Sequence, residues 1–229
     1  DTFGMNMVAL VDGQPRLLNL KQMLECFLSH RREVVTRRTV YELRKARDRG
    51  HVLEGLAVAL ANIDDFIAII RNAPTPPVAK SELMARSWDS KMVREMLTRT
   101  RADGGVVNAD DYRPEGLEAE FGMGQDGLYR LSETQAQEIL QMRLQRLTGL
   151  EQDKIVAEYK DVMSVIEDLL DILAKPERVS TIIGDELTTV KTEFGQTKLG
   201  ARRSLVEYSA QDLSTEDLIT PTDMVVTLS

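Results

Sequence analysis

The chain has 229 residues, of which 42% are hydrophobic, 29% are charged and only 5% are aromatic. So few rings give too little area for one large compact core, and abundant aliphatic residues fit helices packed along narrow seams. The net charge of −8 argues against a nucleic-acid clamp built from the whole chain, because phosphate binding needs a clustered positive field. The single cysteine, Cys26, excludes an intramolecular disulfide and is consistent with a reducing compartment. No apolar run reaches membrane-spanning length.

The two ends of the sequence predict that the chain is a piece of a longer protein. It begins at Asp1 rather than at a methionine, and its last residues, 223–229, read as a strand without a pairing partner.

Residues 3–18 predict a β-hairpin. A strand-like run from Met5 to Val11 is followed by Asp12-Gly13, a strong turn signal. Because a lone hairpin is marginal in water, we expect a returning strand at 204–208 to lie beside it. Residues 1–18 and 200–210 would then form a β base at which the two ends of the chain meet.

Residues 19–74 predict one long outgoing helix, which Asn19 caps and Pro74 ends. A helix of about fifty residues would span roughly 80 Å, so it needs a partner. Residues 151–199 predict that partner, a returning helix interrupted at Pro176. Apolar residues in both helices recur at spacings of three and four, which is typical of a coiled coil. The positions are Leu53, Leu56, Leu60, Ile63, Ile67 and Ile70, and then Ile155, Tyr159, Val162, Ile166, Leu169 and Leu173.

The fold class expected from these segments is mainly α. It combines a long antiparallel two-helix coiled-coil arm, a small helical head at the tip of the arm, and the short β-hairpin with its returning strand at the base. Residues 75–150 would form the head and residues 211–229 a linker.

Within the head, short amphipathic runs at 78–86 and 90–99 predict small helices, and 102–127 reads as loop. Ser132 with Gln135 forms a capping-box start for a helix that reaches 147, and a second such start at Thr148-Gly149-Leu150-Glu151 begins the returning helix. The head is too small to bury all its apolar surface alone, so we expect a homodimer through it. The candidate interface residues are Leu128, Tyr129, Ile139, Leu140, Met142 and Leu144.

Patterns that carry catalysis or ligand binding are weak in this chain. His30 and His51 lie far apart on the long helix and read as helix-surface or packing residues. One cysteine leaves no Cys/His zinc spacing, and the glycine-rich run 122–127 lacks the strand-to-helix context of a dinucleotide site. The sequence therefore predicts no catalytic, cofactor-binding or metal site.

The stretch 31–49 is strongly basic and allows two interpretations. It is either a solvated helix face with intrahelical ion pairs or a surface that faces a polyanion such as DNA. The candidate DNA-facing residues are Arg31, Arg32, Arg37 and Arg38.

Several runs of this chain resemble the A subunits of bacterial type IIA topoisomerases. They are 30–39 (HRREVVTRRT), 42–49 (ELRKARDR), 57–64 (AVALANID), 135–151 (QAQEILQMRLQRLTGLE) and 216–220 (EDLIT). The run 135–151 is more similar to DNA gyrase than to topoisomerase IV.

The resemblance implies a role in DNA strand passage. In such enzymes two A subunits meet at a DNA-cleaving gate and again at an exit gate, the head at the tip of the arm. The chain would thus be the exit-gate part of a gyrase A subunit. With two B subunits, ATP and Mg, the parent enzyme negatively supercoils double-stranded DNA in the bacterial cytoplasm.

The family's nucleophilic tyrosine would lie upstream of Asp1 and its DNA-wrapping domain beyond 211–229, so this piece alone is expected to be non-catalytic and to hold no cofactor. The alternatives are a generic coiled-coil scaffold and a fragment of the topoisomerase IV A subunit.

Overall fold

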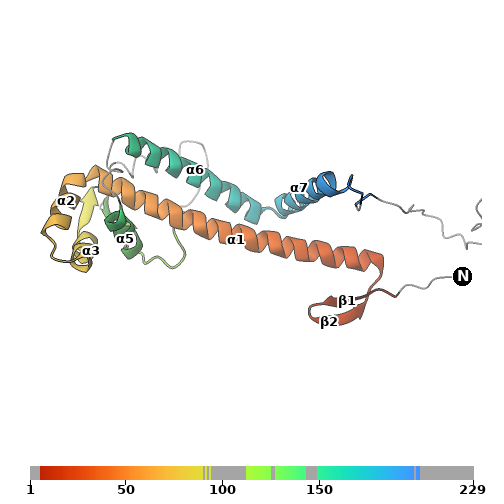
Figure 1. The fold of residues 1–229 in the computed structure, drawn as a ribbon. Coiled ribbons are helices and arrows are strands. Elements are labelled where there is room, and N and C mark those ends of the chain that lie inside the picture. Colours follow the sequence, from red (N-terminus) through yellow and green to blue (C-terminus); the bar gives the residue numbers. More distant parts are fainter. Residues whose placement is uncertain are drawn as a thin grey trace, which may run out of the picture. The chain divides into compact units, whose positions relative to one another are not determined.

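The computed structural model describes residues 6–89, 91, 93, 112–124, 127–142, 149–198, 200 and 201, and these are mainly helical (Figure 1). The chain divides into two compact units. One is formed by Asp1–Arg32 with Thr181–Ser229, and the other by Glu33–Ser180. The predicted class, mainly α with little strand, is confirmed for the described residues.

The predicted hairpin opens the first unit. Strands β1 (Val8–Val11) and β2 (Gln14–Leu17) pair antiparallel, with Val8 opposite Leu17. Both turn residues have positive φ, +54° at Asp12 and +75° at Gly13, as a two-residue hairpin turn requires. The expected returning strand at 204–208 and the linker at 211–229 lie outside the described residues.

Helix α1 (Leu20–Ala61) starts at the predicted cap. The Asn19 side-chain oxygen accepts a hydrogen bond from the Gln22 backbone N–H at 2.8 Å, and Gln22 Oε1 accepts one from the Asn19 N–H at 2.9 Å. This reciprocal pair satisfies two backbone donors that would otherwise lack partners at the helix start.

The prediction of one unbroken helix over residues 19–74 is wrong, because the helix breaks at Asn62. A second helix, α2 (Ile63–Asn72), follows it. The Asn62 side-chain amide donates to the carbonyls of Val58, at 2.9 Å, and Asp89, at 3.0 Å, so it competes with continued helix. Leu53, Leu56 and Leu60 are buried on α1 as a seam would require, but Ile70 on α2 is exposed.

The returning segment is also two helices, α6 (Gly149–Ala174) and α7 (Pro176–Phe194), and the break lies where Pro176 predicted it. Within the second unit α6 lies beside α1 and runs in the opposite direction (Figure 1). Glu54 bonds Tyr159, whereas Gly50, four residues earlier on α1, faces Val162, three residues later on α6. The buried stripe of α6 follows the predicted seam at four positions and shifts by one at two others. It consists of Ile155, Tyr159, Met163, Ile166, Leu169 and Ile172.

Among the described residues between α2 and α6 lie a small sheet and two short helices. The helices are α3 (Pro76–Ala85), which matches the run predicted at 78–86, and α5 (Glu133–Gln141). The strands are β3 (Ser87–Asp89), β4 (Gly122–Met123) and β5 (Leu128–Arg130), ordered β3-β5-β4 and antiparallel. Sequence patterns did not predict this sheet.

Candidate functional site

The six candidate interface residues fall into three groups. Tyr129 and Ile139 are buried inside the chain, at 0% and 4% exposure, whereas Leu128 is 39% exposed. Leu140 and Met142 are half-buried, and Leu144 lies outside the described residues. A single chain does not test the interface, but the burial shows that only Leu128, Leu140 and Met142 of the described five could touch a partner directly.

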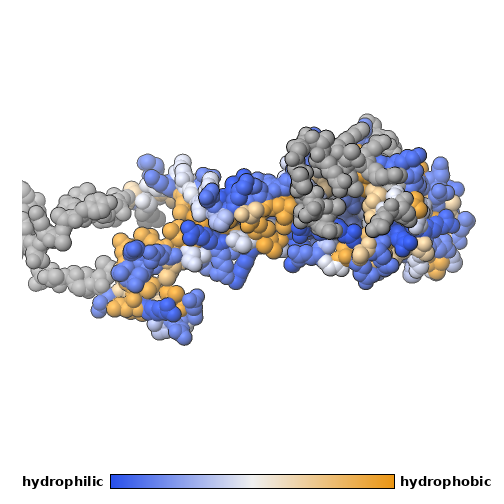
Figure 2. All heavy atoms as spheres, turned by 180° about the vertical axis from the view of Figure 1, so that it is seen from behind, coloured by the Kyte–Doolittle hydropathy of each residue, from blue (hydrophilic) through white to orange (hydrophobic). Residues whose placement is uncertain are grey.

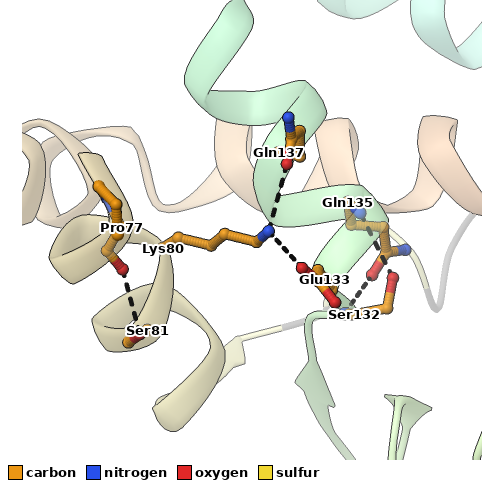
Figure 3. Close-up of polar contacts among 7 residues, drawn as sticks. All are labelled: Pro77, Lys80, Ser81, Ser132, Glu133, Gln135 and Gln137. Atoms are coloured by element: carbon orange, nitrogen blue, oxygen red, sulfur yellow. Dashed lines mark hydrogen bonds and ion pairs between the residues drawn. The ribbon is translucent and has the colours of Figure 1, made fainter.

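Tyr129 belongs instead to a buried polar cluster centred on Gln135, the third residue of α5. The Gln135 side chain is fully buried. Its amide nitrogen donates to the His51 carbonyl oxygen at 2.6 Å and to the Tyr129 hydroxyl at 2.7 Å, and its amide oxygen accepts from the Ser132 N–H at 3.0 Å. The last bond is half of the predicted capping box, which is confirmed (Figure 3). One side chain thus caps its own helix and ties it to α1 and β5.

His51 on α1 completes one side of the cluster. Its Nε2 lies 2.7 Å from Ser132 Oγ and its Nδ1 lies 3.2 Å from Gln135 Nε2. Burial, assisted by the positive charge of Arg113, lowers the pKa of His51 to about 4. The imidazole is therefore neutral near pH 7 and acts as a buried hydrogen-bonding residue. Of the two roles predicted for it, packing is the correct one.

Glu54, one turn further along α1, connects the cluster to α6. The hydroxyls of Tyr129 and Tyr159 donate to its two carboxyl oxygens at 2.8 and 3.0 Å. Burial raises the pKa of Glu54, and the two tyrosine hydrogen bonds and Arg113 partly oppose that shift. Burial and the Glu54 charge raise the pKa of both tyrosines, so both hydroxyls remain donors.

The close approach of α5 to α1 depends on Gly55. A Cβ atom at this position would lie 2.8 Å from Gln135 Cγ and 2.9 Å from Gln135 Cβ. Any side chain there would push the two helices apart, so the glycine permits the contact that the cluster needs.

The outer side of α5 is held to α3 by an exposed ion pair. Lys80 Nζ lies 2.6 Å from Glu133 Oε1 and donates to Gln137 Oε1 at 3.2 Å (Figure 3). The hydrogen bond and charge of Lys80 lower the pKa of Glu133. A shallow pocket on α3 is lined by Pro77, Val78, Ser81, Glu82 and Ala85.

The four candidate DNA-facing arginines differ in their surroundings. Within the first unit Arg31 pairs with Glu186 of α7, and its own side chain is only 28% exposed. Arg37 is exposed and pairs with Glu33 on the same helix, while Arg32 and Arg38 are also exposed. The intrahelical pair favours the solvated-face interpretation for Arg37, whereas Arg31 pairs with another helix and fits neither interpretation well. The DNA-facing interpretation stays a prediction.

The first unit carries exposed apolar side chains in its hairpin. Val8, Leu10 and Leu17 are each at least 66% exposed, and Figure 2 shows hydrophobic residues gathered there. Among the described residues no helix has the length and apolar character to cross a membrane, and no three His, Cys, Asp or Glu side chains are grouped as a metal site would require.

Comparisons with known proteins decide the family. Residues 1–188 match the family model for the A subunit of DNA gyrase/topoisomerase IV. The chain belongs to this family. It is 54% identical over 227 residues to the DNA gyrase A subunit of Pseudomonas aeruginosa, a match that covers 99% of this chain and 23% of that relative. It is 52% identical to the DNA gyrase A subunits of Neisseria gonorrhoeae and of Escherichia coli, over all of this chain and 24% and 25% of those relatives.

The resemblance predicted from the sequence is thus confirmed, and the matched relatives favour gyrase over the alternatives. The chain spans about a quarter of the length of these curated gyrase A subunits. The sequence analysis missed the buried polar cluster. One signal was present: the run 55–60, directly after His51 and Glu54, has no polar side chain, and all six residues are buried in the structure. A helix that is apolar on all sides is enclosed by other elements.

Proposed function

We propose that this chain is the part of a DNA gyrase A subunit that forms the exit gate and holds two A subunits together. Its long α1, with α6 beside it in the opposite direction, would be the coiled-coil arm, and α2, α3, the small sheet and α5 would be the head. The observation that carries the proposal is the match of the whole chain to gyrase A subunits at 50% identity or more in several bacteria.

The parent enzyme would be an ATP-dependent topoisomerase that negatively supercoils double-stranded DNA in the cytoplasm, as an assembly of two A and two B subunits. ATP and Mg would be used in parts of that assembly outside this chain. The chain itself would contribute no catalytic residue and would act by controlling whether the exit is closed.

The head surface supports a partner of the same kind. Leu128 projects from the outer face of β5, the central strand of the small sheet, while its neighbour Tyr129 points inward. Leu140 and Met142 are half-buried at the end of α5. Apolar side chains that remain partly exposed on a monomer are typical of the core of a homodimer interface.

The oligomeric state of the chain tests this proposal. Sedimentation equilibrium would compare the wild type with Leu128→Glu/Leu140→Glu over a range from low micromolar concentrations upward. We expect a wild-type dimer that the double substitution dissociates, because it would bury two unpaired carboxylates. Val165→Glu is the matched control, since Val165 is 50% exposed on α6, away from the head. A wild-type monomer throughout, or equal dissociation by the control, would contradict the proposal.

Ile139 is a poor choice for such a test. It is buried within the chain, so a charge there would disrupt the packing of α5 whether or not the head dimerises.

A second role, contact between α1 and passing DNA, rests on the exposure of Arg32, Arg37 and Arg38. It predicts salt-sensitive DNA retention that falls when Arg37 and Arg38 are both changed to Glu. Retention unchanged by that substitution would remove these residues from any DNA contact.

A further inference from the structure

We propose that His51, Ser132 and Gln135 form an acid-sensitive latch that holds α5 on α1, and that protonation of the imidazole releases α5 and the small sheet while α1 and α6 stay helical. The latch is a property of this chain's own fold. Its use to regulate an exit gate rests on the function proposed above.

The latch joins α5 and β5 to α1 through buried polar side chains. Gln135 bonds to the His51 carbonyl, Ser132 Oγ bonds to the His51 ring, and Tyr129 bonds to Glu54, so α5 and β5 reach α1 at two adjacent turns. The Gly55 contact makes this fit tight, because it leaves no room for another side chain between α1 and Gln135. Loss of the hydrogen bonds to His51 therefore weakens the attachment of α5 to α1 and frees Gln135 to move from its position against Gly55.

The geometry around the imidazole accepts only its neutral form. Gln135 Nε2 carries two N–H groups, and its shortest bonds are to the His51 carbonyl and the Tyr129 hydroxyl. The same nitrogen lies 3.2 Å from His51 Nδ1, so a proton added to Nδ1 would point at an amide donor. On the other side Ser132 Oγ accepts the Gln135 backbone N–H at 3.3 Å and keeps a second lone pair for the Nε2–H of His51, so the conflict lies at Nδ1. Protonation thus creates a donor facing a donor in a buried site.

The charges around the ring do not relieve this conflict. Arg113, on the segment before β4, repels an imidazolium. Glu54 on α1 is the nearest carboxyl of the cluster, but it is neutralised early on acidification because its pKa is raised. Tyr129 on β5 and Tyr159 on α6 stay uncharged, since their pKa values are raised too. No group of the cluster thus offers a compensating negative charge in acid.

The protein carries a convenient reporter of the latch. Trp88 is the single tryptophan of the chain and pairs with Tyr129 across β3 and β5. It is 4% exposed, its ring lies 4.1 Å from that of Phe66, and its Nε1 donates to the Leu83 carbonyl at 2.9 Å. Release of β5 would expose this ring to water and shift its fluorescence.

The test follows Trp88 fluorescence and far-UV circular dichroism of the whole chain from neutral pH down to about pH 4. For the wild type we expect a red shift of the emission while the helical signal persists. The imidazole binds its proton roughly 300-fold more weakly in the latched state than in a free histidine. The emission transition should therefore lie below the ordinary histidine pKa.

His51→Gln should abolish that step, because an amide can bond Ser132 and Gln135 without titrating. His30→Gln is the matched control, since His30 is the other histidine, exposed on the same helix, and it should behave as the wild type. The same emission transition in wild type and His51→Gln would overturn the latch. A red shift of the emission that coincides with loss of the helical signal in the wild type would also overturn it.

A direct titration covers the case in which His51→Gln fails to fold. NMR of the wild type with labelled histidines, in which His30→Gln assigns the two rings, should show a strongly lowered pKa for the His51 ring. A His51 ring that titrates at the ordinary histidine pKa would overturn the proposal. Neither readout depends on oligomeric state, so failure here leaves the exit-gate proposal intact, and a monomeric chain leaves the latch intact.

Discussion

Gly55→Ala is expected to destabilise this chain although it places a better helix former in the middle of a helix. On propensity alone the change would stabilise α1 by about 1 kcal/mol. The new Cβ, however, would lie 2.8 to 3.0 Å from three carbon atoms of Gln135, including its Cβ, which is fixed to the α5 backbone. Rotation of the Gln135 side chain cannot relieve that contact, so α5 must move. Overpacking of this kind costs about 1–3 kcal/mol.

The movement also disturbs the hydrogen bonds of Gln135. A buried donor or acceptor left without its partner costs about 1–3 kcal/mol. Subtracting the propensity gain from these two costs, we expect a net loss of about 3 kcal/mol in the free energy of unfolding.

Gly50→Ala is the control on the same helix. A Cβ there would meet only Val162 Cγ1, at 3.6 Å, which is an ordinary contact, so this change should stabilise by up to about 1 kcal/mol. Urea unfolding, followed by Trp88 fluorescence and far-UV circular dichroism, measures both variants. If Gly55→Ala stabilises the chain as much as Gly50→Ala does, the close packing of α5 on α1 is refuted.

Other predictions concern pH and the helix break. Because the folded pKa of His51 lies near 4, below its unfolded value of 6.5, the unfolded chain binds more protons and stability falls as pH drops through that window. The loss from this group is about 3 kcal/mol by pH 4 and should be absent in His51→Gln, measured by urea unfolding at several pH values. The raised pKa of Glu54 acts with the opposite sign, so Glu54→Gln should deepen the acid loss. Asn62→Ala removes hydrogen bonds to two carbonyls and should lower the free energy of unfolding by about 1 kcal/mol. Asn72→Ala, at the exposed end of α2, is the control and should lower it less. Equal losses would refute the idea that the Asn62 side chain stabilises the break between α1 and α2.

Local signals in the sequence predicted the structure well where it is determined by residues close together in the sequence. Asp12-Gly13 predicted the hairpin because only a few residue types adopt positive φ easily. Ser132 with Gln135 predicted the start of α5 because both halves of a capping box lie within four residues. Pro176 predicted the break between α6 and α7 because it cannot supply a helical N–H.

Features that depend on distant partners were not predictable in the same way. Each strand of the small sheet has two or three residues, too few to show alternation, and Trp88 pairs with Tyr129 across some forty positions. Asn62 breaks the helix partly because its amide reaches Asp89. Gln135 gave a capping signal, but nothing local indicates that the same amide also bonds His51, far earlier in the chain.

The central claim, that two copies of this chain meet through the head, is tested most directly by a distance between copies. A nitroxide label would be attached at Glu82→Cys, an exposed site on α3, in a Cys26→Ser background, and dipolar coupling would be measured in the singly labelled protein. If the heads dimerise, the label gives a defined intermolecular distance, and this distance disappears with Leu128→Glu/Leu140→Glu. No coupling at Glu82→Cys, together with coupling from a label on the native Cys26, would show that the copies associate elsewhere and would contradict the exit-gate proposal.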